Sequence, residues 1–180
     1  TLMKKSLILI ALLVAPFLAS AQNAFDVFED QKDVTSFVAT KNMFKLLSKM
    51  DFDSNDPEVK EYLELVNSLD NIKIFTTDNI SVASKMNDAV SKYVSASSSL
   101  SELMRVKDDG KNIKFYSKEG KDTNHVSELL MHLTGDLDGK ERTVIMSITG
   151  NIDLKKVSKL TKDLNVPGTE ELKNIDKKKQ

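Results

Sequence analysis

The sequence predicts an α+β fold in which a mixed, mostly antiparallel sheet has helices packed on one face. Short β-branched segments alternate with amphipathic helical segments in the first half of the chain. The second half consists mainly of alternating segments separated by Gly/Asp turns, which is typical of hairpins. The expected order of elements is β-α-α-β-α-β-β-β-β-α. The early crossovers would be right-handed if the strands that they join were parallel.

Residues 1–21 are predicted to be a cleavable signal peptide outside the fold. Lys4 and Lys5 form a positive start, residues 7–19 form an apolar stretch, and the small residues Ala-Ser-Ala end at Ala21. The apolar stretch has 13 residues, whereas a membrane-spanning helix needs roughly 20. We therefore expect cleavage after Ala21, no stable membrane span afterwards, and a periplasmic or secreted product.

The chain contains no cysteine, so no lipid-accepting cysteine follows the apolar stretch. The same absence excludes disulfides, thiol catalysis and cysteine-rich zinc sites. Cleavage leaves 159 of the 180 residues, enough for one domain with an apolar core. We assign that single α+β domain to residues 22–165 and a flexible charged tail to residues 166–180.

The charges of the chain argue against nucleic-acid binding. Removing Lys4 and Lys5 with the signal peptide leaves 24 basic and 27 acidic residues, a net charge of −3. The two signs are mixed along the chain, and there is no Trp for base stacking. A nucleic-acid-binding surface would instead show a basic stripe with interleaved aromatic residues.

The first predicted strand and helix occupy residues 34–50. The β-branched and aromatic segment VTSFVAT at 34–40 indicates a strand. The next segment, residues 41–50, has helical spacing and is expected to pack back onto that strand through Met43, Phe44, Leu47 and Met50.

A second helix, strand and helix follow. Asp56 and Pro57 are typical of a helix start, and the apolar stripe beyond them consists of Val59, Leu63, Val66 and Leu69. Residues 72–78 alternate and indicate the second strand. Asp78 or Asn79 is expected to cap the next helix, whose core-facing residues are Val82, Met86, Ala89, Val90 and Tyr93.

The later elements are hairpin strands and a closing helix. Residues 101–120 form a predicted hairpin around Asp108-Asp109-Gly110. The segment TVIMSIT at 143–149 indicates another strand, reached through a Gly/Asp loop. Asn151 or Asp153 is expected to cap a last helix, whose core-facing residues are Leu154, Val157, Leu160 and Leu164.

Residues 124–134, NHVSELLMHLT, contain both histidines of the chain. A helical face is formed by Val126, Leu129, Leu130 and Leu133. An alternating strand instead has Leu129, Met131 and Leu133 inward and Glu128, Leu130 and His132 outward. The short loop to the following strand favours antiparallel pairing and therefore a strand. His125 and His132 would then lie on opposite faces, because their separation is odd, and would not bind one metal ion together.

No catalytic, cofactor-binding or metal-binding residue is predicted. Residues 51–58 place Asp51, Asp53 and Asn55 at calcium-loop spacing, but Asp56 and Tyr62 replace the required Gly and Glu. We interpret this segment as an acidic helix-capping loop. For catalysis, His125 and Ser127 are merely local neighbours without a supported acid, and the chain has no G-x-S-x-G or S-x-x-K motif.

Three segments together resemble a family of domains of unknown function, DUF4252. They are VTSFVATKNMFKLL, SELMRVKDDGKNIKFYSKEG and VIMSITGNIDLKKVSKL. The likeness covers nearly the whole mature chain and is sharpest at residues 144–160. It implies that Val126–Thr134 is a strand, and that the protein is one of the small exported proteins of Bacteroidota with a role in the cell envelope. Many relatives look like lipoproteins, which this cysteine-free chain does not. The resemblance provides no catalytic residue or ligand.

The sequence favours an exported, non-enzymatic protein of unknown role that binds an envelope protein or component. Leu130 and Phe115 are candidates for outward apolar residues on an exposed sheet face or edge. The alternative is a small-ligand or metal carrier with a cavity between sheet and helices. A hydrolase whose polar residues converge only in three dimensions is less favoured. The sequence identifies neither the partner nor an oligomeric state.

Overall fold

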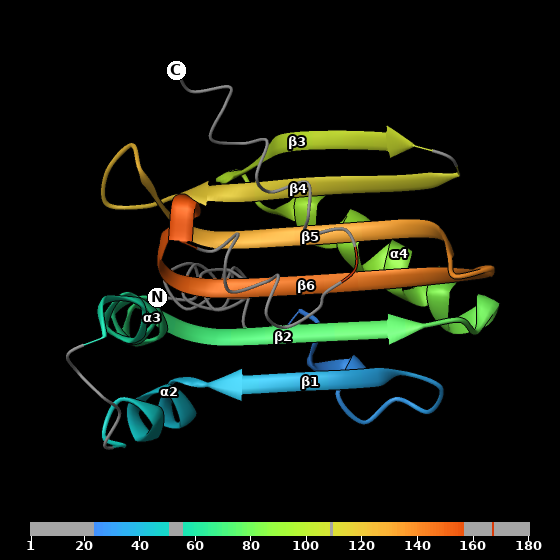
Figure 1. The fold of residues 1–180 in the computed structure, drawn as a ribbon. Helices are drawn as coiled ribbons and strands as arrows, with labels where there is room; N and C mark the ends of the chain where they lie inside the picture. Colours follow the sequence, from blue (N-terminus) through green and yellow to red (C-terminus); the bar gives the residue numbers. More distant parts are fainter. Residues whose placement is uncertain (1–23, 51–55, 109, 157–166, 168–180) are drawn as a thin grey trace, which may run out of the picture.

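The computed structural model describes residues 24–50, 56–108, 110–156 and 167. Its helices and strands are shown in Figure 1. In chain order they are η2 (Asp26–Phe28), β1 (Thr35–Thr40), α2 (Lys41–Leu47), α3 (Pro57–Ser68), β2 (Leu69–Thr77), α4 (Ile80–Ala96), β3 (Leu100–Asp108), β4 (Lys111–Glu119), β5 (His125–Leu137) and β6 (Lys140–Asp153).

One six-stranded sheet with the order β1-β2-β6-β5-β4-β3 organises the described residues. All five of its strand pairings are antiparallel. Strands β3 to β6 form a meander, and β6 inserts between β5 and β2. The α+β fold and the order of elements predicted from the sequence are therefore confirmed. The last strand is followed by a helical turn at 154–156.

Helix α4 and the 3-10 helix η2 cover one face of the sheet. In Figure 1, α4 runs behind the strands. Asn79 caps it as predicted, because its side chain accepts hydrogen bonds from the backbone N–H groups of Ser81 and Val82. The apolar cluster on this face joins both helices to the strands. Its buried members are Phe25, Phe28, Phe75, Val82, Met86, Val90, Leu100, Tyr116, Leu130 and Ile145.

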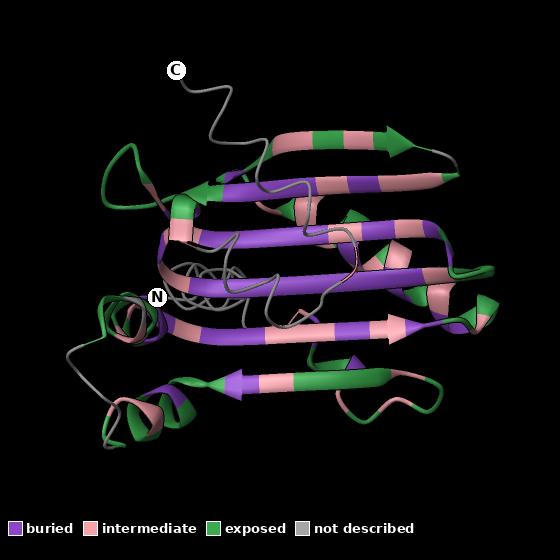
Figure 2. Cartoon of the chain, in the orientation of Figure 1, coloured by how far each residue is buried: buried purple, intermediate pink, exposed green. Residues whose placement is uncertain are grey.

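The opposite face holds a larger apolar cluster, to which α2 and α3 contribute at one end of the sheet. Phe44 comes from α2, and Leu65 and Val66 come from α3. Their strand partners include Phe115, Leu129, Met131, Leu133, Val144, Met146 and Ile148. The sheet thus has an apolar cluster on each face, and Figure 2 shows its central strands as predominantly buried.

Local turn chemistry fixes the hairpins. Asp138 and Gly139 connect β5 to β6 with φ angles of 57° and 79°, which is the positive-φ pattern of a tight hairpin turn. Gly150, with φ of 139°, lies where β6 meets the start of β2. A Cβ atom there would approach the carbonyl oxygen of Ser68 to 2.5 Å. This close backbone contact explains the glycine in the Gly-Asn-Ile-Asp junction.

Burial on both faces corrects one prediction. We expected Glu128, Leu130 and His132 to point outward and Phe115 to be exposed. Leu130 and Phe115 are instead fully buried, and Glu128 is only 3% exposed. The alternation of β5 from Glu128 to Leu133 was predicted correctly. The strand pattern does not reveal, however, that α4 covers the face that holds Leu130, or that Phe115 belongs to the apolar cluster of the opposite face. Leu130 and Phe115 therefore provide no binding surface.

Two helices bury less of their predicted stripes than expected. In α2, Phe44 is buried and Leu47 is partly buried, whereas Met43 and Met50 are exposed. In α3, the buried residues are Leu65 and Val66 rather than the whole predicted stripe, and Leu69 begins β2.

Several predictions lie outside the described residues. These are the signal peptide at 1–21, the positions with calcium-loop spacing (Asp51, Asp53 and Asn55), the helical positions Val157, Leu160 and Leu164, and the charged tail apart from Pro167. Asp153 does cap the final turn as expected, since its carboxylate accepts a hydrogen bond from the backbone N–H of Lys155 at 2.9 Å.

Candidate functional site

A buried carboxylate lies beneath α4. Both carboxylate oxygens of Glu128 lie 2.8–2.9 Å from the Tyr93 hydroxyl, which donates from α4. Burial raises the pKa of Glu128, while the hydrogen bond from Tyr93 and the charge of Lys118 oppose that rise. Thr149 is the cross-strand neighbour of Glu128 on β6, and its buried hydroxyl oxygen has no hydrogen-bond partner. The contact between Glu128 and Tyr93 fixes α4 to the sheet.

His132 forms a second polar contact between the sheet and α4. Its Nε2 atom lies 2.8 Å from the Oδ1 atom of Asn87, so the neutral ring donates to the amide oxygen. Burial, together with a smaller effect of the positive charge of Lys114, lowers the pKa of His132 to about 4. A histidine that is neutral and bonded in this way acts as a structural contact at neutral pH.

His125 and His132 are far apart, but the odd number of residues between them is not the reason. A break in the β5 register between Val126 and Glu128 interrupts the alternation on which the parity argument depends. Seven residues of strand at about 3.3 Å each still separate His125 from His132 by roughly 23 Å. Within residues 24–50, 56–108 and 110–156, no three His, Asp or Glu side chains gather as a metal-binding group.

His125 instead lines a cleft at one end of β3, β4 and β5. The cleft has a volume of about 730 Å³ and an apolar part formed by Leu103, Val126 and Leu154. Its polar lining includes Ser101, Ser117, Glu119, Asp122, Thr123 and Asn124. The Nδ1 atom of His125 lies 2.7 Å from Asp122, and this contact lowers the pKa of Asp122. The hydroxyl of Ser101 donates to the Ser117 backbone carbonyl.

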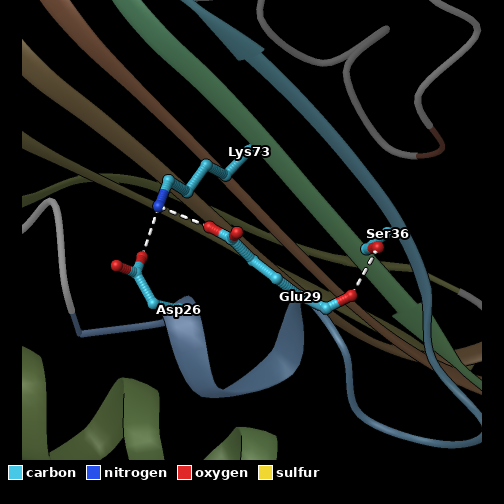
Figure 3. A network of polar contacts seen from close by, with 4 residues as sticks. All are labelled: Asp26, Glu29, Ser36 and Lys73. Atoms are coloured by element: carbon cyan, nitrogen blue, oxygen red, sulfur yellow. Dashed lines mark hydrogen bonds and ion pairs between the residues drawn. The ribbon is translucent and has the colours of Figure 1, made fainter.

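A third polar network fastens the N-terminal segment to the sheet, as Figure 3 shows. Lys73 on β2 donates to Asp26 and, at 2.7 Å, to Glu29. Burial alone would lower the pKa of Lys73, but the two acidic partners outweigh that effect and raise it. Ser36 on β1 donates to the Glu29 backbone carbonyl at 2.8 Å. These contacts join η2 to β1 and β2, a role that the sequence did not reveal.

An exposed apolar surface lies at the β1 end of the sheet. We name it the β1–α2 patch and define it as Phe37, Met43, Leu46 and Met50. Their side chains are 39%, 41%, 66% and 58% exposed, respectively. Met43, Leu46 and Met50 have i, i+3, i+7 spacing, and the backbone keeps helix-like turns to Met50. Phe44 and Leu47 therefore form only the buried part of the apolar surface of α2, and the remaining part is exposed.

Phe37 belongs to the same surface as the α2 stripe. Phe37 and Ala39 lie two residues apart on β1 and so share a face of the sheet. Ala39 is buried in the cluster that also contains Phe44 and Leu47 of α2. The exposed Phe37 ring thus lies on the same side of the strand as the contacts of Ala39 with α2.

The chain matches a family described as "Domain of unknown function (DUF4252)" over residues 28–160. The chain belongs to the DUF4252 family. The matched range begins within η2 and contains every strand of the sheet, together with the cleft and the β1–α2 patch. It also contains the Gly-Asn-Ile-Asp junction on which the sequence resemblance was sharpest.

Two further comparisons of this DUF4252 chain gave no match, one with curated proteins and one with solved structures. Among the described helices, none is both long and apolar enough to span a membrane. Family membership thus identifies the domain without assigning an activity, and its surfaces provide the physical basis for a functional proposal.

Proposed function

We propose that this DUF4252 protein is an exported, non-enzymatic protein that binds an envelope protein through the β1–α2 patch. The observation behind the proposal is the exposure of four large apolar side chains on α2, on the turns that follow it and on the neighbouring edge strand. Contiguous apolar surface of this kind is typical of interaction sites in soluble proteins. Methionine side chains also adapt their shape to a partner.

Export rests on the N-terminal sequence. Lys4 and Lys5 precede an apolar stretch that ends in small residues at Ala21, which is the pattern that signal peptidase recognises. The envelope as the compartment of the partner follows from this pattern together with the absence of a lipid-accepting cysteine.

The non-enzymatic role rests on how the ionisable groups are used. Glu128 bonds to Tyr93, and His132 bonds to Asn87, so both residues fix α4 to the sheet. His125 pairs with Asp122, three residues away in the adjoining turn. Each of these groups has a local structural partner, which supports a scaffold rather than a reacting site.

Site-specific crosslinking in intact cells tests the proposal. A photo-reactive residue at Leu46 should capture an envelope protein, and Met43→Asp should reduce that capture about tenfold, because a charge would be desolvated in an apolar interface. Ile80 is the matched control, since it is a single apolar residue that is 85% exposed at the start of α4.

A photo-reactive residue at Ile80 should give no specific adduct, and Ile80→Asp should leave capture at Leu46 unchanged. Thermal unfolding of the purified variants checks that both are folded. Equal adducts from the two positions, or none from Leu46, would contradict the proposal.

A second function is favoured by the cleft, whose volume of about 730 Å³ is within the range of small-molecule sites. In this alternative, the protein is a small-ligand carrier that binds over Leu103, Val126 and Leu154. Thermal-shift measurements across a panel of lipids and metabolites test it. A shift that Leu103→Ala abolishes would support the carrier function, and no shift with any compound would remove it.

A further inference from the structure

We propose that the partner binds by adding an extended segment to the open edge of β1, as one more strand of the sheet. This inference rests on the proposed function, in which the β1–α2 patch is a protein-binding surface. It specifies the chemistry of the partner: an uncharged segment of about six residues, matching the length of β1, with apolar side chains on the α2 side.

The geometry of β1 suits strand addition. β1 is an end strand of the sheet and pairs with β2 from Thr35 to Thr40 without a register break. In Figure 1, the loop of residues 29–34 runs below the first part of β1 and α2 lies beyond its end, and no described strand lies along its outer edge. Since an antiparallel strand bonds to each neighbour through alternate residues, pairing with β2 leaves half of its backbone groups directed outward.

The β1 edge also lacks the usual protection against pairing. Proteins normally block exposed edges with charged residues, Pro or bulges. The β1 sequence TSFVAT contains no charged residue and no Pro. The other edge, β3, has a register break between Glu102 and Met104, and its charged residues are Glu102, Arg105, Lys107 and Asp108. The contrast indicates that β1, and not β3, is the edge adapted for pairing.

The side chains of β1 define the register that a partner would meet. Phe37 and Ala39 point toward the α2 side, whereas Ser36 and Val38 point toward the side of η2. Alternate residues of an added strand would therefore lie beside Phe37 and continue the β1–α2 patch. Main-chain hydrogen bonds would provide affinity, and the patch would select apolar side chains.

The test uses the full-length protein in intact cells, with photo-reactive residues placed singly at Thr35, Phe37 and Leu46. Crosslinked peptides are identified by mass spectrometry. We expect Thr35 and Phe37 to capture the same partner segment at positions about two residues apart, because paired strands advance together. Leu46 should capture the same protein.

A charge on the edge provides the matched variants. Thr35→Lys should reduce capture at Leu46 about tenfold, because an added strand would meet an edge-blocking charge. Asp108→Lys places a lysine on the other edge strand, β3, outside the cleft, and should leave capture unchanged. Thermal unfolding of both purified variants verifies that the sheet is intact.

The outcomes separate the two proposals. Capture at Leu46, with no ordered capture at Thr35 and Phe37, would overturn strand addition and leave the proposed function standing. Absence of specific capture at all three positions would overturn both. Ordered crosslinks between two copies of this chain through Thr35 and Phe37 would show that a second copy occupies the edge, and would overturn the proposal of a different partner protein.

Discussion

At the scale of single residues, the polar side chains beneath α4 decide how the sheet and helix are joined. Glu128, His132 and Thr149 all lie on strand faces that α4 covers or adjoins. Tyr93 and Asn87 provide hydrogen-bonding groups for the first two, and these partners compensate much of the desolvation cost. The hydroxyl of Thr149 has no such partner. If the neighbouring Glu128 carboxyl gained a proton, it could donate a hydrogen bond to that hydroxyl oxygen.

His132 should make the stability of the protein depend on pH. Its pKa is lowered to about 4 in the fold, whereas an unfolded histidine titrates near 6.5. Between these values the unfolded chain binds more protons, so stability is present above about pH 6.5 and is lost as pH falls toward 4. We expect a loss of up to about 3 kcal/mol over that interval, measured by urea unfolding at a series of pH values.

His132→Gln is the informative variant, because a glutamine amide still donates to Asn87 but does not titrate. The raised pKa of Glu128 has the opposite sign: its folded state holds the proton more tightly, so that contribution is lost as pH rises. The difference between wild type and variant isolates the histidine. If the free energy of unfolding changed with pH equally in the two proteins, the pKa of His132 would not be lowered by burial as described.

At the scale of elements, η2 is a structural part of the domain. Most residues of the segment 25–33 are acidic or basic, which by itself is typical of a solvent-exposed lead-in. Phe25 and Phe28 are nevertheless 1% and 3% exposed, and Lys73 bonds to two acids of the same segment. A single helical turn can bury two aromatic rings in this way only when the sheet face and α4 form their surroundings.

Neighbouring residues of η2 provide a direct test. Phe28→Ala should lower the free energy of unfolding by about 3–5 kcal/mol, because it removes a buried ring and leaves a cavity. Val27→Ala should change it by no more than about 0.5 kcal/mol, since Val27 is 67% exposed. Urea unfolding of the two variants measures both effects. Similar losses would mean that η2 does not pack as described.

At the scale of the whole molecule, the sheet has two unlike edges. The charged and irregular β3 edge is protected, and the uncharged, regular β1 edge lies beside an exposed apolar helix stripe. Both sheet faces contain buried apolar clusters. The sequence left a sheet face or a sheet edge open as the binding surface. Since Leu130 and Phe115 are buried, the binding surface proposed for this DUF4252 protein is the edge.

The proposed export predicts a defined mature chain. Cleavage after Ala21 should leave Gln22 as the first residue, so that Phe25 and Phe28 stay with the domain whose core they enter. Intact-mass analysis of protein recovered from the envelope fraction checks this boundary. A recovered chain that retains residues 1–21, or one found with the cytoplasmic fraction alone, would contradict the prediction.

The sequence by itself determined the features that depend on neighbours along the chain. Period-two alternation located the strands, Asn79 and Asp153 capped helical turns, and Gly/Asp turns joined the hairpins. Each of these follows from backbone sterics and hydrogen bonds within a few residues. The family was identifiable from the same local segments.

Only the tertiary structure decided which surfaces are covered and which are exposed. The insertion of β6 between β2 and β5 and the placement of α4 bring together residues distant in sequence, such as His132 and Asn87. The same long-range packing buries Leu130 and Phe115 but leaves Met43 and Leu46 exposed. An alternating strand specifies two faces without specifying what packs on each, because that choice depends on contacts between elements rather than on local periodicity.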